Sequence, residues 1–196
     1  MGRPTGLEPA TPGTTNQCSN QLSYDRHYAL EKARALLKGE GPQLASEAAM
    51  FNPTVERFGY PKTLIREYPH WLVLLRPAQV TAGSLVLAAK SEATAFAELP
   101  AGAFTELGTA VAEIEATLRR AVDYERINYL MLMLVDPNVH FHVLPRYAGE
   151  RRLAGIPRPD VGWPGPPDLK SAVELTETQI GDARHALAAA WVARQN

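Results

Sequence analysis

The clearest periodic pattern in the chain covers residues 101–122, where apolar side chains recur at intervals of three and four positions. In an α-helix this spacing places them on one stripe. The stripe consists of Phe104, Leu107, Val111, Ile114 and Leu118. Most charged side chains of the segment, including Glu113, fall off it. We therefore predict one long amphipathic helix over 101–122.

Short apolar runs on both sides of this segment predict β-strands. The runs are Thr63–Glu67, His70–Leu75, Ser84–Ala89, Ile127–Val135 and Asn138–Leu144. The run "INYLMLMLV" at 127–135 is almost unbroken, which favours a central strand buried on both faces, with a buried helix as the alternative. Pro145 is expected to end the last strand. About five strands and one long helix with short connections predict an α+β domain with an antiparallel sheet.

The two ends of the chain follow other patterns. Residues 1–22 are rich in Pro, Gly, Thr and Asn, and predict a disordered tail. They also resemble peptides translated from DNA that overlaps a tRNA gene, which leaves open a natural start further downstream. A helix is predicted at Asp25–Lys38, within a domain over 23–150. Residues 151–196 predict a proline-rich extended arm and a final helix from Thr176 to Arg194, begun by a capping box.

Composition restricts the partners and the compartment. The chain has 196 residues, enough for one domain with a substantial core, and a net charge of -1. This balance argues against a nucleic acid or an anionic membrane as the main partner. The single cysteine, Cys18, excludes an intrachain disulfide and fits a cytoplasmic location. No apolar run is long enough for a transmembrane helix, and the N-terminus has no secretory signal pattern.

The segment "DPNVHFHVLPRY" at Asp136–Tyr147 carries the candidate chemistry. Alternation in a strand places Val139, Phe141 and Val143 on one face, which is expected to be core. Asn138, His140 and His142 then share the other face, about 7 Å apart along the strand. Such a row can present polar groups to one ligand.

The residues alone leave three interpretations of this row. It can be a solvated face of a half-exposed strand, a functional site, or a metal site in which both histidines reach one ion. The metal interpretation needs a further ligand, for which Asp136 has the right parity.

A family likeness favours the functional interpretation. The stretch "NVHFHVLPR" resembles the signature of the histidine triad (HIT) family, His-φ-His-φ-His-φ-φ, often followed by Pro-Arg, where φ is apolar. Asn138 stands at the position of the first histidine. The order of predicted elements over 60–150 is also that of HIT proteins. The resemblance implies a HIT-like α+β fold and commonly a homodimer.

HIT proteins are mostly nucleotide hydrolases and transferases that act on a phosphorus attached to a nucleoside. The resemblance implies that His140 is the nucleophile and forms a nucleotidyl-histidine. It implies that His142 contacts phosphate oxygens or helps the leaving group, and that Asn138 orients and supports the nucleophile. We expect no tightly bound cofactor and no protein metal site, although a divalent metal can accompany the nucleotide.

Four further residues are candidates for substrate binding. Arg76 and Gln79 lie in the connection between two predicted strands, on the side where a HIT ligand would lie. An arginine suits phosphate because its guanidinium is a fork of donors. Ser84 is a candidate phosphate contact, and Arg146 can reach a phosphate or a partner subunit.

The departures from the family pattern support a second hypothesis. Asn138 replaces a histidine, and the link Asp136-Pro137 is short where many HIT hydrolases carry a longer Gly-rich loop with a polar residue for the phosphate. The alternative is therefore a nucleotide- or phosphate-binding protein of HIT fold with little catalysis. The sequence does not choose between dinucleoside polyphosphates, nucleoside phosphoramidates and nucleotide sugars.

Overall fold

A computed structural model describes residues 51–192 of the chain. The predicted tail at 1–22, the predicted helix at Asp25–Lys38 and Cys18 lie outside the described residues. Within the described part, no helix combines the length and the apolar character needed to cross a membrane.

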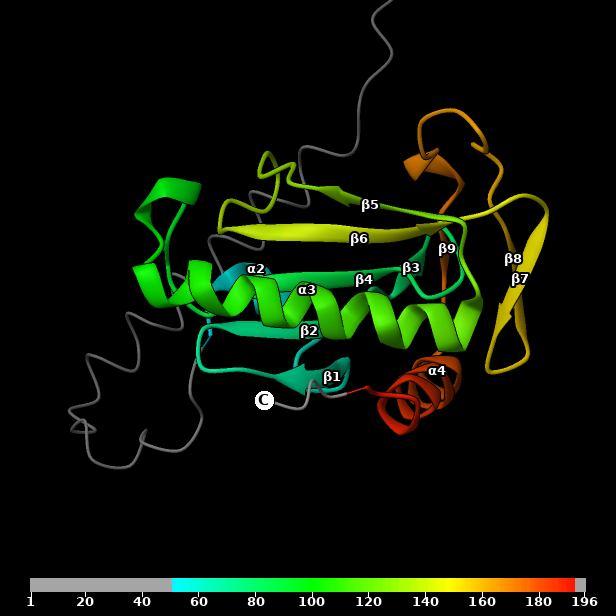
Figure 1. Ribbon diagram of the computed structural model, residues 1–196, viewed down its shortest axis with the longest axis horizontal. Coiled ribbons are helices and arrows are strands. Elements are labelled where there is room, and N and C mark those ends of the chain that lie inside the picture. Colours follow the sequence, from blue (N-terminus) through cyan, green and yellow to red (C-terminus); the bar gives the residue numbers. More distant parts are fainter. Residues whose placement is uncertain (1–50, 193–196) are drawn as a thin grey trace, which may run out of the picture. The chain divides into compact units, whose positions relative to one another are not determined.

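One antiparallel sheet organises the described part, and it confirms the predicted α+β class (Figure 1). Its five strands lie in the order β1-β2-β4-β6-β5. They are β1 (Leu64–Glu67), β2 (Trp71–Leu75), β4 (Leu85–Ala89), β6 (His140–Arg146) and β5 (Arg126–Leu130). Every neighbouring pair is antiparallel, so short connections suffice between strands that follow each other in the chain.

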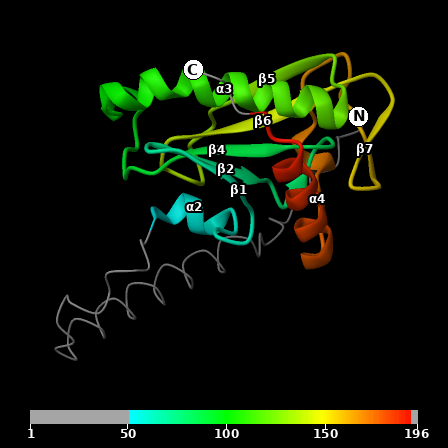
Figure 2. The ribbon, with the colours of Figure 1, turned by 60° about the horizontal axis from the view of Figure 1, so that its bottom comes forward.

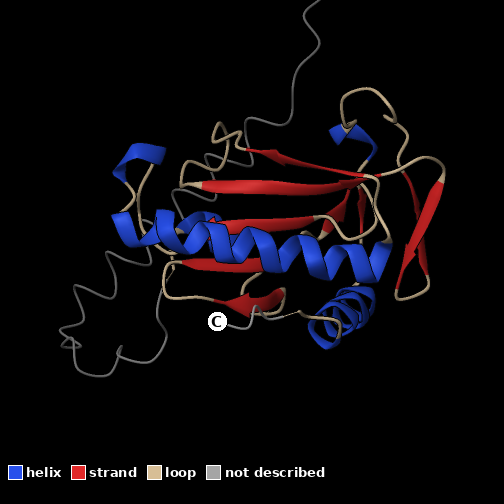
Figure 3. Ribbon diagram, in the orientation of Figure 1, coloured by secondary structure: helices blue, strands red, loops and turns tan. Residues whose placement is uncertain are grey.

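The long helix α3 (Ala101–Val122) crosses one face of this sheet, as Figures 1 and 3 show. Its predicted bounds are confirmed, but its buried face is turned relative to the predicted stripe. Phe104 is 41% exposed, whereas Glu113 is only 4% exposed. The Glu113 carboxylate accepts hydrogen bonds from the Tyr68 hydroxyl at 2.6 Å and from the indole Nε1 of Trp191 at 3.0 Å. These bonds offset the cost of burying a charge, which the apolar pattern could not predict.

The opposite face of the sheet is covered in part by the short helix α2 (Pro53–Arg57), as Figure 2 shows. Periodicity did not predict this helix, because five residues are too few for a pattern. Asn52 caps it, since its Oδ1 accepts a hydrogen bond from Val55 N at 3.1 Å. The Nδ2 of Asn52 donates to the carbonyls of Ala89 and Ser91, both at 2.8 Å, and so fastens the helix to the end of β4.

The apolar run at 127–135 was wrongly predicted as a central strand. Strand β5 ends at Leu130 and forms an edge of the sheet, and residues 131–135 belong to the connection that leads to β6. Leu134 is 89% exposed. The connection before β6 is therefore longer than the Asp136-Pro137 link that the sequence suggested.

Pro145 does not end the histidine strand as predicted, because β6 continues through Arg146. Strand β4 pairs with β6 only as far as Leu85 opposite Val143, so Pro145 has a ladder partner on one side alone, Ile127 of β5. A proline is tolerated at such a position because its missing N–H is not needed by a second neighbour.

The region after Arg146 is not a simple extended arm. It begins with a hairpin of β7 (Glu150–Leu153) and β8 (Ile156–Pro159), and β9 (Val173–Glu174) pairs with β3 (Ala78–Gln79). Two short 3₁₀ turns, η1 (Phe96–Glu98) and η2 (Leu169–Ser171), complete the described elements. The final helix α4 (Glu177–Ala189) begins with the predicted capping box of Thr176 and Gln179.

Candidate functional site

Strand β6 places His140 and His142 on the face of the sheet that carries α2. His140 lies opposite Ala88 of β4 and His142 opposite Val86, both of which belong to the apolar cluster beneath α2. The centroids of the two imidazoles are 5.0 Å apart, with the ring planes at 88°. The histidines are 1% and 8% exposed, so they form a buried pair and not a solvated face.

Phe58, which follows α2, packs its ring against both histidines. Its ring centroid lies 5.5 Å from that of His140 and 5.6 Å from that of His142. This apolar contact lowers the local dielectric, which strengthens every electrostatic interaction made by the imidazoles.

The backbone of Asn138 fixes the state of His140. The carbonyl oxygen of Asn138 lies 2.8 Å from His140 Nδ1. A carbonyl can only accept, so Nδ1 carries a proton, and in the neutral imidazole Nε2 then keeps its lone pair. His140 Nε2 is buried and has no hydrogen-bond partner within residues 51–192. A neutral imidazole with a free, desolvated Nε2 has the form that a nitrogen nucleophile requires.

The side chain of Asn138 does not point from a strand toward a ligand, as the predicted strand implied, but forms hydrogen bonds with neighbouring segments. β6 begins at His140, so Asn138 lies just before the strand. Its Oδ1 accepts from the Thr54 hydroxyl at 3.0 Å, and its backbone N–H donates to the same hydroxyl oxygen at 3.2 Å. Its Nδ2 donates to the carbonyl of Glu92 at 3.1 Å. These bonds hold the backbone, and therefore the carbonyl that orients His140.

Arg76 brings a cation to this face directly after β2. Its Nε and Nη1 are buried and have no hydrogen-bond partner in the described part of the chain. Burial lowers the pKa of Arg76, while the nearby carboxylates of Glu174 and Asp136 oppose that change. The guanidinium remains protonated because its ordinary pKa is far above neutral.

His142 is held in the neutral form. Burial above all, and then the charges of His140 and Arg76, lower its pKa from the ordinary value of 6.5 to about 4. Its Nδ1 is buried without a hydrogen-bond partner among the described residues. Two imidazole nitrogens and two guanidinium nitrogens on one sheet face thus lack a hydrogen-bond partner among the described residues, and the arginine favours an anionic ligand.

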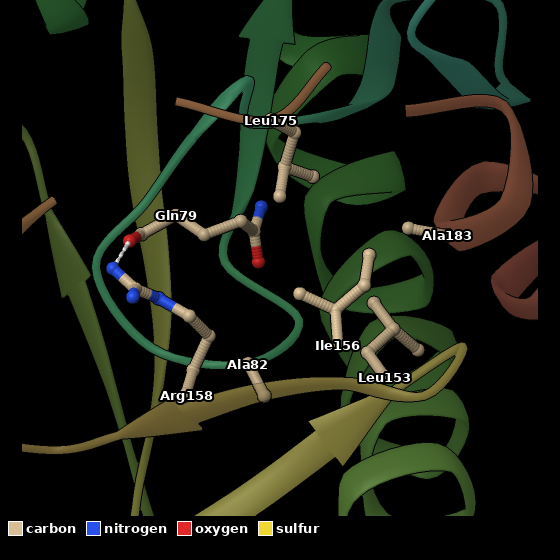
Figure 4. A pocket seen from close by; sticks show the side chains of 7 residues that line it. All are labelled: Gln79, Ala82, Leu153, Ile156, Arg158, Leu175 and Ala183. Carbon is tan, nitrogen blue, oxygen red and sulfur yellow. Dashed lines mark hydrogen bonds between the residues drawn. The ribbon is translucent and has the colours of Figure 1, made fainter. Parts of the chain in front are cut away.

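Gln79 and Ser84 were predicted to bind substrate, but their polar groups are used inside the connection 76–84. The amide of Gln79 donates to the carbonyls of Arg76 and Ser84, and its Oε1 accepts from Ser84 N. The Ser84 hydroxyl bonds with Thr81. Gln79 also lines a small cavity of about 10 Å³ whose other lining side chains are mainly apolar. Figure 4 shows the hydrogen bond that Arg158 donates to the backbone carbonyl of Gln79. Both residues shape the loop that positions Arg76.

Arg146 lies at the far end of β6, where each of its three guanidinium nitrogens donates a hydrogen bond. Its Nε and Nη2 reach the carboxylate of Asp160 at 2.6 and 3.2 Å, and Nη1 donates to Asn128 Oδ1 at 2.7 Å. Nη2 also donates to the carbonyl of Gly165 at 2.9 Å. Arg146 and Asp160 are 4% and 7% exposed, so this is a buried ion pair that fastens the loop after β8 to the sheet.

That loop forms one wall of a pocket that the sequence did not reveal. The pocket has a volume of about 400 Å³. Its lining comprises Arg126, Asn128, Leu130, Arg146 and the segment Trp163–Pro167. The motif "GWPGPPDL" is visible in the sequence, but its neighbours in space are not. Thr54 and Phe58 were not predicted as site residues, because the helix that contains Thr54 and precedes Phe58 is too short for a pattern.

The metal interpretation gains no third ligand from the described residues. Asp136 forms an ion pair with Arg57 at 3.1 Å. Across residues 51–192, no group of three or more His, Cys, Asp or Glu side chains is placed to hold a metal ion.

Solved structures of histidine triad proteins have the same fold. A histidine triad protein from Sinorhizobium meliloti superposes with a TM-score of 0.56 and 21% identity, over 70% of this chain and 95% of the other. One from Marinobacter aquaeolei gives 0.53 and 23%, over 72% and 96%. A hypothetical histidine triad nucleotide-binding protein from Sulfolobus tokodaii gives 0.50 and 15%, over 65% and 82%. No family model and no curated protein matches the sequence significantly. The likeness shows the fold, as the sequence resemblance predicted.

Replacing Thr54 by valine tests the bond between α2 and Asn138. The change leaves the buried Oδ1 and backbone N–H of Asn138 without that hydroxyl, so we expect the free energy of unfolding to fall by about 1–3 kcal/mol. The exposed Thr105 provides a matched control, and Thr105→Val is expected to change it by less than about 0.5 kcal/mol. Urea denaturation measures both, and equal effects would contradict the role of Thr54.

The low pKa of His142 predicts how stability depends on pH. The unfolded chain binds this proton near pH 6.5, whereas the folded chain binds it only near pH 4. The free energy of unfolding should therefore fall as the pH drops from 6.5 to 4. His142→Gln should remove this part of the slope, and the same change at the exposed His185 should not. An NMR titration that finds His142 protonating near pH 6.5 would refute the prediction.

Proposed function

We propose that this chain, which has the fold of the histidine triad proteins, is an enzyme that hydrolyses or transfers nucleotides at a nucleoside-linked phosphate. The observation that supports this most is the free Nε2 of His140, fixed by the Asn138 carbonyl and flanked by unpartnered groups of His142 and Arg76. One protein with this fold, that of Sulfolobus tokodaii, is described as a hypothetical nucleotide-binding protein.

In the first step, the lone pair of His140 Nε2 forms a bond to the phosphorus. The bond between phosphorus and the leaving group breaks, and the leaving group departs with that electron pair and takes a proton from water. The product is a nucleotidyl-histidine. The Asn138 carbonyl supports this step because it stabilises the positive charge that develops on the imidazole through Nδ1–H.

In the second step, water attacks the same phosphorus and the bond to Nε2 breaks. The nucleotide leaves as a monophosphate, a proton passes to solvent, and His140 returns to its neutral form. An alcohol, an amine or a phosphate in place of water gives transfer instead of hydrolysis. Two displacements at one phosphorus replace a single harder one, which is the general advantage of covalent catalysis.

Arg76 and His142 supply the charge complementarity. The guanidinium of Arg76 can place its free Nε and Nη1 donors on phosphate oxygens. His142 is neutral at pH 7, so it acts as a hydrogen-bond donor to the phosphate and not as a protonated acid. Phosphoryl transfer depends mainly on such positioning and charge stabilisation, which a rigid strand provides.

The proposal extends to the cofactor and the partners. The substrate is a nucleotide, accompanied by a divalent cation where its phosphates require one, and no cofactor is bound permanently. A homodimer is part of the proposal, and within residues 51–192 β5 forms an edge of the sheet at which a second copy could pair. The cytoplasmic location stays a prediction.

A binding protein with little catalysis is the second candidate. The connection at 131–135 is apolar throughout, so it brings no polar side chain to the phosphate from that side. The same free donors on Arg76 and the imidazoles would then hold a nucleotide without turning it over. A metal-binding function is less favoured, because the described residues supply only the two histidines.

Turnover of adenylated and guanylated substrates separates these candidates. His140→Ala should lower the rate by about 10³-fold or more, because it removes the nucleophile. The matched control is His185→Ala on the exposed face of α4, which should retain the rate. Intact mass after quenching without acid should show a nucleotidyl adduct on the wild type but not on His140→Ala.

Two results would contradict the proposal that the chain is an enzyme. Ligand-dependent thermal stabilisation without turnover or adduct would establish the binding protein. Equal turnover by wild type and His140→Ala would place the chemistry elsewhere.

A further inference from the structure

The pocket between β5 and Trp163–Pro167 opens on the same side of the sheet as the two histidines. Residues that face each other across an antiparallel pair share a side, and Leu130 lies opposite His142. Asn128 and Arg126 continue along β5, opposite Leu144 and Arg146. All three β5 residues line the pocket, so the pocket begins beside His142 and runs away from His140.

The wall made by Trp163–Pro167 is rigidly attached. Asp160 accepts from Arg146, from Tyr147 N and from Gly162 N, and Gly165 O accepts from Arg146. Gly162 allows the tight fold of this loop, because an added Cβ would lie 2.4 Å from the carbonyl oxygen of Pro166. The buried ion pair therefore preorganises the indole and proline rings against β5 before any ligand arrives.

The reaction geometry indicates which part of a substrate reaches this pocket. In an in-line displacement the leaving group departs on the side of the phosphorus opposite the nucleophile. The pocket lies beyond His142 as seen from His140, so a leaving group that departs on the His142 side of the phosphorus enters it. Leu130, the cross-strand neighbour of His142, is where the pocket starts.

The lining indicates the chemistry of that group. The indole of Trp163 and the proline rings offer flat apolar surfaces for stacking. Arg126 donates, and Asn128 offers its NH₂ because its Oδ1 already accepts from Arg146. No carboxylate is among the residues that line the pocket, so sugar hydroxyls would find no charged acceptor there. A planar ring with acceptor atoms on its edge fits this set, as in a nucleobase.

We infer that this pocket holds the departing half of the substrate and that this half carries a planar, acceptor-edged heteroaromatic ring. The inference rests on the proposed function and selects among its substrates. A dinucleoside polyphosphate, which leaves as a second nucleotide, fits the pocket. A phosphoramidate of a small amine leaves it unused, and a nucleotide sugar fits it poorly.

Trp163→Ala tests the inference when rates on two adenylated substrates are compared. For a dinucleoside polyphosphate we expect kcat/KM to fall about tenfold, which is the loss of one base stack. For an adenosine phosphoramidate of methylamine it should stay within about twofold, because that leaving group does not reach the pocket. Val161→Ala, in the same loop but 59% exposed, should leave both rates unchanged, and Trp163→Phe should restore the first. Equal losses on both substrates, or no loss on either, would overturn the inference.

A binding measurement keeps the inference separate from the proposed function. The chain has three tryptophans. The indole N–H groups of Trp71 and Trp191 are bonded to the Ala103 carbonyl and to Glu113, so their ¹⁵N signals serve as internal references. In His140→Ala, a dinucleoside polyphosphate should shift the Trp163 signal, and ribose 5-phosphate, which lacks a base, should not. If no substrate is turned over, this shift still supports the pocket, and its absence refutes it.

Discussion

The hydrogen bond between the Asn138 carbonyl and Nδ1 of His140 is the interaction on which the proposed chemistry depends. It decides which nitrogen carries the proton, and therefore which nitrogen has a lone pair to offer. Because the acceptor is a backbone atom, the bond does not require a histidine at position 138. The departure from the histidine triad pattern is consequently compatible with an oriented nucleophile. The position of this carbonyl depends on the backbone at residue 138. The surrounding hydrogen bonds fix that backbone, and with it the orientation of His140.

That support comes from the short helix α2 and the ends of the central strands. Thr54 bonds both the side chain and the backbone N–H of Asn138, while Asn52 joins the helix to the end of β4. The pairing of Val139 with Ala89 and Ala93 extends the sheet up to the first residue of β6. Burial then does two things. It leaves His140 Nε2, His142 Nδ1 and two nitrogens of Arg76 without a hydrogen-bond partner among the described residues, and it lowers the pKa of His142 so that this imidazole is neutral at pH 7.

The sequence predicted the parts of this arrangement that depend on local pattern. The long helix, most of the strand positions along the chain and the shared face of His140 and His142 follow from periodicity, and the family likeness drew attention to Arg76. What it could not predict depends on contacts between distant segments. Glu113 is buried because Tyr68 and Trp191 form hydrogen bonds with it, and the Gln79 amide forms hydrogen bonds within its own loop. The apolar run at 131–135 looked like a core strand, since periodicity cannot tell a buried strand from exposed apolar residues. Arg146 reached a carboxylate, Asp160, in a proline-rich stretch that showed no pattern at all.

The most direct test of this account is the tautomer of His140, read from long-range ¹H–¹⁵N spectra of the imidazoles at pH 7. The account predicts a protonated Nδ1 and an unprotonated Nε2 for His140, in the wild type and in Thr105→Val alike. The Nε2 shift should move toward that of a substituted nitrogen when a nucleotide adduct forms. A spectrum in which Nε2 carries the proton, or in which both nitrogens do, would contradict it, because His140 would then have no lone pair directed at the phosphorus.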